Sequence, residues 1–295
     1  MKNTVFTGAA VAIVTPMNAD GTVNYNRLDE LIDWQIANGT QAIVICGTTG
    51  ESSTLNHEEH VACIDHAIRS AKGRVPVIAG TGSNDTAYAI ELSLEAERAG
   101  ADALLVVTPY YNKTSQRGLV AHYQAIADSV HTPIILYNVP GRTGMTISIP
   151  TYKELAKHPN IVATKEASSD IGHIAKVFAA CGDELDVYSG NDNEIVPILS
   201  LGGKGVISVM SNCLPRETNE ICSLYHAGNV RESAALQLRL LDFVNSLFCD
   251  VNPIPVKAAM NLMGKDVGEC RLPLAPMSED GLATLRGAME RAGVL

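Results

Sequence analysis

The chain has 295 residues, a formal net charge of −10 and a hydrophobic fraction of 46%. This length suits one large domain or two smaller ones, and the apolar content excludes a disordered chain. The acidic balance argues against nucleic-acid binding, which requires a basic face. Because no apolar run is long enough to span a membrane and residues 1–11 lack the pattern of a signal peptide, we expect a cytoplasmic protein.

The 7 cysteines are scattered without a C-x-x-C pair. An odd number without pairing is typical of reduced thiols rather than a disulfide framework. The cysteines therefore agree with a cytosolic location.

Short apolar, β-branched runs recur along the first two thirds of the chain. They occupy residues 10–15, 42–46, 75–79, 103–108, 133–137, 161–165, 185–189 and 205–209. None alternates cleanly between apolar and polar residues, which is typical of strands buried on both faces of a parallel sheet.

Helical patterns lie between these runs. Asn24 is a predicted cap for a helix over 28–36, Asn56 with Glu59 forms a capping-box pattern, and Asp85 precedes a helix that ends at Gly100. Repeated strand–helix units at this length favour a TIM (β/α)₈ barrel, although spacing alone leaves an open doubly wound sheet as the alternative. After residue 216 only helices are predicted, over 217–227, 231–248, 256–263 and 279–292. We therefore expect a barrel over 1–225 and a C-terminal helical segment over 226–295.

Active sites of such barrels lie at the carboxyl ends of the strands. Four polar segments follow predicted strands, at residues 47–52, 108–112, 137–144 and 164–166. We expect their hydroxyl, amine and guanidinium groups to meet at one rim.

Lys165 ends an apolar strand, where desolvation favours the neutral, nucleophilic amine. From its position alone, the commoner roles are an ion pair with Glu166 or extension of the amine to solvent. Tyr137 ends the preceding strand and could transfer protons, or it could be a half-buried ring. Thr48 and Thr49, in a glycine-rich turn, and the guanidinium of Arg142 suit small carboxylates.

Several other motifs are absent or incomplete. The histidines at 57 and 60 are three residues apart, whereas the zinc-helix pattern needs four, so we expect an exposed first helical turn. The sequence contains no G-x-S-x-G elbow and no phosphate-binding loop. Carbonyl chemistry without a metal or cofactor is the expectation that remains.

Six segments together resemble the dihydrodipicolinate synthase family. They are Gly-Thr-Thr-Gly-Glu-Ser at 47–52, Pro-Tyr-Tyr-Asn at 109–112, Tyr-Asn-Val-Pro-Gly-Arg-Thr-Gly at 137–144, Lys-Glu-Ala at 165–167, Gly-Val-Ile-Ser at 205–208 and Asn-Pro-Ile-Pro-Val-Lys at 252–257. The resemblance covers residues 7–295, nearly the whole chain.

The resemblance implies a pyruvate-dependent lyase of the class I aldolase type. A Schiff base of pyruvate with Lys165 would condense with L-aspartate-4-semialdehyde to give 4-hydroxy-tetrahydrodipicolinate, the first committed step of diaminopimelate and lysine biosynthesis. The residues that match the family's site are Tyr137 as proton donor and acceptor, Thr48 and Tyr111 as its hydroxyl relay, Thr49 and the Ile207 backbone in the pyruvate pocket, and Arg142 at the mouth. Tyr111 would reach in from a neighbouring subunit of a homotetramer made of two tight dimers.

The resemblance also extends to a site at which L-lysine inhibits many family members. The residues that match it are Ser52, Ser53, His57, His60, Asn84 and Tyr110. Tyr88 stands where lysine-sensitive bacterial enzymes commonly carry a glutamate, so lysine inhibition stays open.

The alternatives are related enzymes and a non-catalytic barrel. N-acetylneuraminate lyase and 2-keto-3-deoxy sugar-acid aldolases share the barrel and its lysine. Neuraminate lyases typically carry Ser-Thr where this chain has Thr48-Thr49, which favours the synthase. A barrel that only binds pyruvate-like ligands would be expected to lack Lys165 or Tyr137, and both are present.

Overall fold

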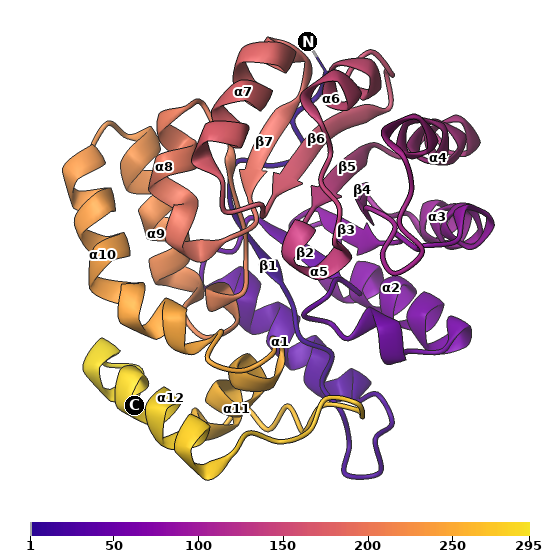
Figure 1. Cartoon of the computed structure of the whole chain (residues 1–295). Coiled ribbons are helices and arrows are strands. Elements are labelled where there is room, and N and C mark those ends of the chain that lie inside the picture. The colour runs from indigo at the N-terminus through magenta and orange to yellow at the C-terminus, as the bar shows by residue number, and fades with distance from the viewer. Residues whose placement is uncertain (1) are drawn as a thin grey trace.

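The structure, a computed structural model, describes residues 2–295 apart from the side chain of Asp183. Within this range, eight parallel strands close into a barrel in chain order, and β1 pairs with β8 (Figure 1). The strands are β1 (Gly8–Ala12), β2 (Ala42–Ile45), β3 (Val77–Gly80), β4 (Ala103–Val107), β5 (Ile134–Asn138), β6 (Ile161–Glu166), β7 (Asp186–Ser189) and β8 (Gly205–Ser208). The predicted TIM barrel is confirmed, and the open sheet is excluded because its first and last strands would not pair.

Most of the helices surround the barrel, whereas the short helix α5 lies over its centre in the view of Figure 1. The α-helices are α1 (Tyr25–Ala37), α2 (His57–Ala71), α3 (Thr86–Ala99), α4 (Gln116–Ser129), α5 (Pro140–Thr143), α6 (Ile149–Leu155), α7 (Ile171–Cys181), α8 (Ile195–Ser200), α9 (Pro215–His226), α10 (Val230–Ser246), α11 (Ile254–Leu262) and α12 (Glu279–Ala292). Asn24, Asn56 and Asp85 cap α1, α2 and α3 as predicted, each side chain accepting a backbone N–H of the first turn.

The strands divide the core into two layers, because successive side chains of a strand point to opposite faces. Inside the barrel lie residues such as Ala10, Val44, Leu105, Tyr137 and Ile207. Their sequence neighbours pack outward against the helices. The pairing of β5 with β6 contains a register shift: Ile134 pairs with Ile161, but Ile135 pairs with Ala163, so Val162 is an extra residue in β6.

The C-terminal helices α10, α11 and α12 gather on one side of the barrel, beside α9 and α1 (Figure 1). They form the predicted C-terminal helical segment, and the division at residue 225 stays a proposal. Of the helices in the described range, none is long and apolar enough to cross a membrane.

Candidate active site at the carboxyl ends of the strands

Lys165 and Tyr137 lie side by side inside the barrel. They are paired neighbours on β6 and β5, and the Lys165 ammonium lies 4.4 Å from the centroid of the Tyr137 ring. Lys165 is only 5% exposed, and no described carboxylate lies within ion-pairing distance of it. A buried amine without a salt bridge, beside a phenol, is the arrangement that Schiff-base chemistry with a carbonyl substrate uses.

Glu166 is not the partner of Lys165, because the two side chains lie on opposite faces of β6. Glu166 is fully buried in the outer layer, where it accepts hydrogen bonds from Asn138 Nδ2 at 2.9 Å and from the Tyr152 hydroxyl on α6. His173 Nε2 on α7 lies 3.9 Å from the same carboxylate. The alternative in which Glu166 neutralises Lys165 is therefore wrong.

Asp192, between β7 and α8, is a buried acidic group that lies close enough to Lys165 for their charges to interact. Burial raises the pKa of Asp192, while hydrogen bonds and the positive charge of Lys165 oppose that rise. Its Oδ2 atom accepts the backbone N–H groups of Val209 and Met210 at 3.0 and 2.9 Å, directly after β8. Asp192 thus fixes the turn that follows Ile207, whose side chain is buried inside the barrel.

Thr48 and Thr49 belong to the loop that follows β2. Cys46 and Glu51, on either side of the turn, both have positive φ angles, of 54° and 56°. This left-handed conformation is costly for residues other than glycine and persists only where the surroundings enforce it. Thr49 is buried, and its hydroxyl oxygen accepts a hydrogen bond from Asn252 Nδ2 at 3.1 Å.

Arg142 is exposed on the short helix α5, at the mouth of a cavity of about 330 Å³. Its Nη2 atom donates to the carbonyl of Asn252 at 3.2 Å. Thr48 also lines this cavity, whereas Lys165, Tyr137, Thr49 and Ile207 are not among the described residues that line it. The structure therefore places Arg142 and Thr48 at the cavity, Lys165, Tyr137 and Ile207 inside the barrel, and Thr49 in the buried part of the loop that follows β2.

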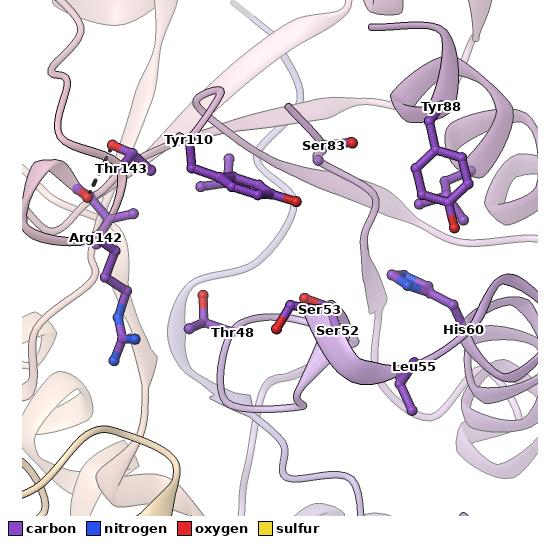
Figure 2. A pocket seen from close by; sticks show the side chains of 14 residues that line it. Thr48, Ser52, Ser53, Leu55, His60, Ser83, Tyr88, Tyr110, Arg142 and Thr143 are labelled. Atoms are coloured by element: carbon purple, nitrogen blue, oxygen red, sulfur yellow. Dashed lines mark hydrogen bonds between the residues drawn. The ribbon is translucent and has the colours of Figure 1, made fainter. Parts of the chain in front are cut away.

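The same cavity extends to most of the residues that resemble the lysine site. Figure 2 shows Arg142 on one side, His60 and Tyr88 on the other, and Thr48, Ser52 and Ser53 between them. Tyr110 also lines it. Outside the lining, His57 packs on Tyr88 with ring centroids 5.9 Å apart, and Asn84 donates to the Tyr110 carbonyl at 3.2 Å.

The expectation of an exposed first helical turn is wrong for His60. This side chain is 4% exposed, and its Nε2 atom lies 2.7 Å from the Gly80 carbonyl. Burial lowers the pKa of His60, so the neutral ring is favoured. The apolar spacing of Ile64 and Ala67, four and seven residues further along α2, is the signal that could have shown its burial.

Tyr111 differs from the other candidates because it points into solvent. It is 93% exposed and has a φ of 69°, again in the left-handed region. Within this chain it does not join Tyr137 or Thr48, so the single chain does not complete the predicted relay.

The prediction missed two kinds of residue. Ser83, Val139 and Thr143 line the cavity, and the Thr143 hydroxyl donates to the Val139 carbonyl at 3.3 Å (Figure 2). Asn252 contacts both Thr49 and Arg142. The Asn-Pro-Ile-Pro-Val-Lys motif pointed to Asn252, but not to its contacts.

Fold and site together define a (β/α)₈-barrel enzyme with a buried lysine at the carboxyl end of its sixth strand. A model of the dihydrodipicolinate synthetase family matches residues 5–292. The chain is 53% identical over 295 residues to 4-hydroxy-tetrahydrodipicolinate synthase of Acetivibrio thermocellus, with 100% of both chains covered. The chain belongs to the dihydrodipicolinate synthetase family.

Solved structures agree with this assignment. The chloride-inhibited dihydrodipicolinate synthase of Acinetobacter baumannii in complex with pyruvate is similar with a TM-score of 0.96 and 46% identity, covering 99% of this chain and 100% of that one. A lysine-bound structure from Cyanidioschyzon merolae has a TM-score of 0.96 and 40% identity, covering 99% of this chain and 100% of that one. These relatives favour a lyase-type dihydrodipicolinate synthase over N-acetylneuraminate lyase and the sugar-acid aldolases.

Proposed function

We propose that this enzyme condenses pyruvate with L-aspartate-4-semialdehyde to give 4-hydroxy-tetrahydrodipicolinate, which commits carbon to diaminopimelate and lysine biosynthesis. The observation that carries the proposal is Lys165, a buried amine without an ion-pair partner among the described residues, beside the phenol of Tyr137. The names of the full-length relatives support this choice of reaction.

In the proposed reaction, the Lys165 amine attacks the keto carbon of pyruvate and water leaves, which gives an iminium. The iminium withdraws electrons, so a methyl proton can leave to form an enamine. The enamine carbon then bonds to the aldehyde carbon of the semialdehyde, the C=O π bond breaks, the oxygen takes a proton to become a hydroxyl, and the enamine becomes an iminium again. The amino group of this second substrate finally attacks the imine carbon, which closes the ring and releases Lys165.

Each remaining site residue has a role in this scheme. Tyr137 transfers protons to and from the reacting carbon and oxygen atoms, and Thr48 with Tyr111 connects it to solvent. Thr49 and the backbone at Ile207 bind the carboxylate of pyruvate. Arg142 binds the carboxylate of the semialdehyde, since a guanidinium fork at a cavity mouth suits that group.

The homotetramer made of two tight dimers follows from the family resemblance, and the exposure of Tyr111 supports a subunit contact at this residue. A tyrosine that is 93% exposed on a left-handed backbone has few contacts of its own chain to hold it there. A second subunit would bury this ring and bring its hydroxyl to the partner's site. We place the assembled enzyme in the cytoplasm.

We also propose L-lysine as an effector that binds among Ser52, Ser53, His60, Tyr88 and Tyr110. Tyr88 lacks the carboxylate expected there, but Glu58 and Glu91 lie close enough to help raise the pKa of Tyr88 beyond the effect of burial. These carboxylates can attract the ammonium of lysine. Initial-rate assays with millimolar lysine test this, and no response would count against it.

Borohydride trapping tests the proposed function directly. Incubation with pyruvate and borohydride should add a reduced pyruvyl group to Lys165, mapped by mass spectrometry. Lys257 is an internal control, because it is also buried but is paired with Glu51 at 2.9 Å. Absence of the adduct on Lys165, or equal labelling of Lys257, would overturn the proposal. Turnover with aspartate semialdehyde, compared with N-acetylmannosamine and glyceraldehyde, then identifies the aldehyde.

A further inference from the structure

The loop that carries Thr48 and Thr49 is held by three residues of the C-terminal segment, Asn252, Lys257 and Arg271, which we call the clasp. They reach it from 203 to 220 residues further along the chain. We infer that the clasp positions this loop to bind the pyruvate carboxylate, and that Asn252 orients the Thr49 hydroxyl. This inference rests on the proposed function.

Asn252 determines what the Thr49 hydroxyl can do. The Asn252 amide donates to Thr49 Oγ1 at 3.1 Å, so this oxygen already accepts a hydrogen bond. A hydroxyl carries a single proton, which is then free to be donated elsewhere. A carboxylate of the substrate only accepts hydrogen bonds, so a threonine held in this state is prepared to bind it.

Asn252 also contacts the residue proposed for the second substrate. Its backbone carbonyl accepts from Arg142 Nη2 at 3.2 Å, while its side chain binds Thr49. One buried residue of the C-terminal segment thus fixes a group for each of the two carboxylates. Asn252 is a positioning residue, since it acts through Thr49 and Arg142.

Lys257 and Arg271 fix Glu51, the left-handed residue at the end of the loop. The Lys257 ammonium donates to Glu51 Oε1 at 2.9 Å, to the Thr15 carbonyl at 3.2 Å and to the Glu269 carbonyl at 2.7 Å. The Arg271 backbone N–H donates to Glu51 Oε2 at 2.9 Å. All three ammonium protons and both carboxylate oxygens are therefore used.

A buried ion pair of this kind contributes little net stability relative to an apolar pair, because both charges lose their hydration. The ion pair of Lys257 with Glu51 instead holds the strained turn between Cys46 and Glu51 in one defined geometry. The inference therefore predicts that pyruvate binding and folding stability respond differently when the clasp is changed.

The first test is Asn252→Asp, which keeps the size of the side chain but replaces the amide donor by an acceptor. The Thr49 proton would turn toward the new carboxylate, and the added charge would repel pyruvate. The KM for pyruvate should rise about ten- to a hundredfold, the range expected for a lost hydrogen bond to a charged group. Asn245→Asp, exposed on α10, adds the same charge to the C-terminal segment and should leave this KM within twofold.

The second test separates positioning from folding. Lys257→Met leaves the Glu51 carboxylate buried without its cation and should lower the thermal midpoint. The double variant Glu51→Gln/Lys257→Met removes both charges and should recover most of the midpoint while the KM for pyruvate stays raised. Arg291→Met, which removes an exposed ion pair to Asp242, is the control and should change neither quantity.

Two results would overturn the inference: a KM for pyruvate within twofold of wild type in Asn252→Asp, or recovery of both midpoint and KM in the double variant. Failure of the proposed function is recognised separately. In that case the wild-type enzyme itself would not be trapped by pyruvate and borohydride at Lys165.

Discussion

Tyr137→Phe separates the proton-transfer role of Tyr137 from its packing role. The substitution removes one hydroxyl and keeps the ring that lies 4.4 Å from the Lys165 ammonium. General acid–base catalysis by one side chain contributes about 10²- to 10⁴-fold in rate, or about 3–5.5 kcal/mol in the barrier. We therefore expect turnover to fall by that factor while the imine with pyruvate still forms slowly.

The expected effect on stability is much smaller. A chain of 295 residues has an unfolding entropy of about 0.6 kcal/mol/K, from about 2.1 cal/mol/K per residue. Loss of a hydroxyl that costs at most about 1 kcal/mol would then move the thermal midpoint by less than about 2 °C. A large loss of turnover with an almost unchanged midpoint is thus the signature of a catalytic phenol.

Tyr188→Phe is the matched control. Tyr188 pairs with Lys165 from the other side, on β7, but its hydroxyl donates to the Phe6 carbonyl at 2.7 Å. Its loss should cost stability and leave turnover within a few-fold. Steady-state assays with both substrates, together with timed borohydride trapping, measure each expected result. Full turnover in Tyr137→Phe, or an equal loss in both variants, would refute the reasoning.

Three further predictions concern the outer layer, the acid limit of stability and the cavity mouth. Tyr152→Phe removes the hydroxyl that donates to the buried Glu166 carboxylate and should lower the free energy of unfolding by about 1.5–3 kcal/mol. Calorimetry should show a lower thermal midpoint, and an unchanged midpoint would contradict this prediction. The hydrogen bond from Arg271 holds the pKa of Glu59 below its ordinary value of 4.5. The stability that the ionised Glu59 contributes is therefore present above pH 4.5 and is lost as the pH falls through the lowered pKa. Glu59→Gln should therefore flatten the acid side of a urea-midpoint profile between neutral pH and about pH 3, and an unaltered slope would count against it. Arg142→Ala should raise the KM for the semialdehyde at least about tenfold, because the guanidinium is proposed to bind the carboxylate of this substrate only. Borohydride trapping of pyruvate should be unchanged. An unchanged KM for the semialdehyde would show that Arg142 does not belong to the site.

The barrel was predictable because each strand is a short apolar run with a helix pattern behind it. The predicted strand over 161–165 compares with β6 at Ile161–Glu166, and the helix predicted over 279–292 matches α12. Lys165 could be singled out because a charged residue at the end of an apolar strand requires explanation, but its position alone favoured a structural role, and the resemblance of the surrounding motifs to the family made it the predicted nucleophile. These signals are local in the sequence and therefore visible without coordinates.

The support of the loop after β2 was not predictable in this way. The contacts of Asn252 and Lys257 with Thr49 and Glu51 join residues 203 and 206 positions apart, and no periodicity in either segment records them. His60 was misjudged for a related reason: the residues just before it, His57 to Glu59, are polar, and the Gly80 carbonyl that it contacts belongs to β3, 20 residues further along the chain.

The extra residue in β6 has a consequence for the chemistry of the barrel. Ile161 and Lys165 are four positions apart, so in a regular strand both would point to the same face. The register shift at Val162 lets Ile161 pack among the helices while Lys165 enters the barrel. The one inserted residue in β6 thus determines whether the amine of Lys165 or the carboxylate of Glu166 points into the barrel, where pyruvate is proposed to bind. A simple alternation of inward and outward residues counted from Ile161 would have assigned the two groups the wrong way round.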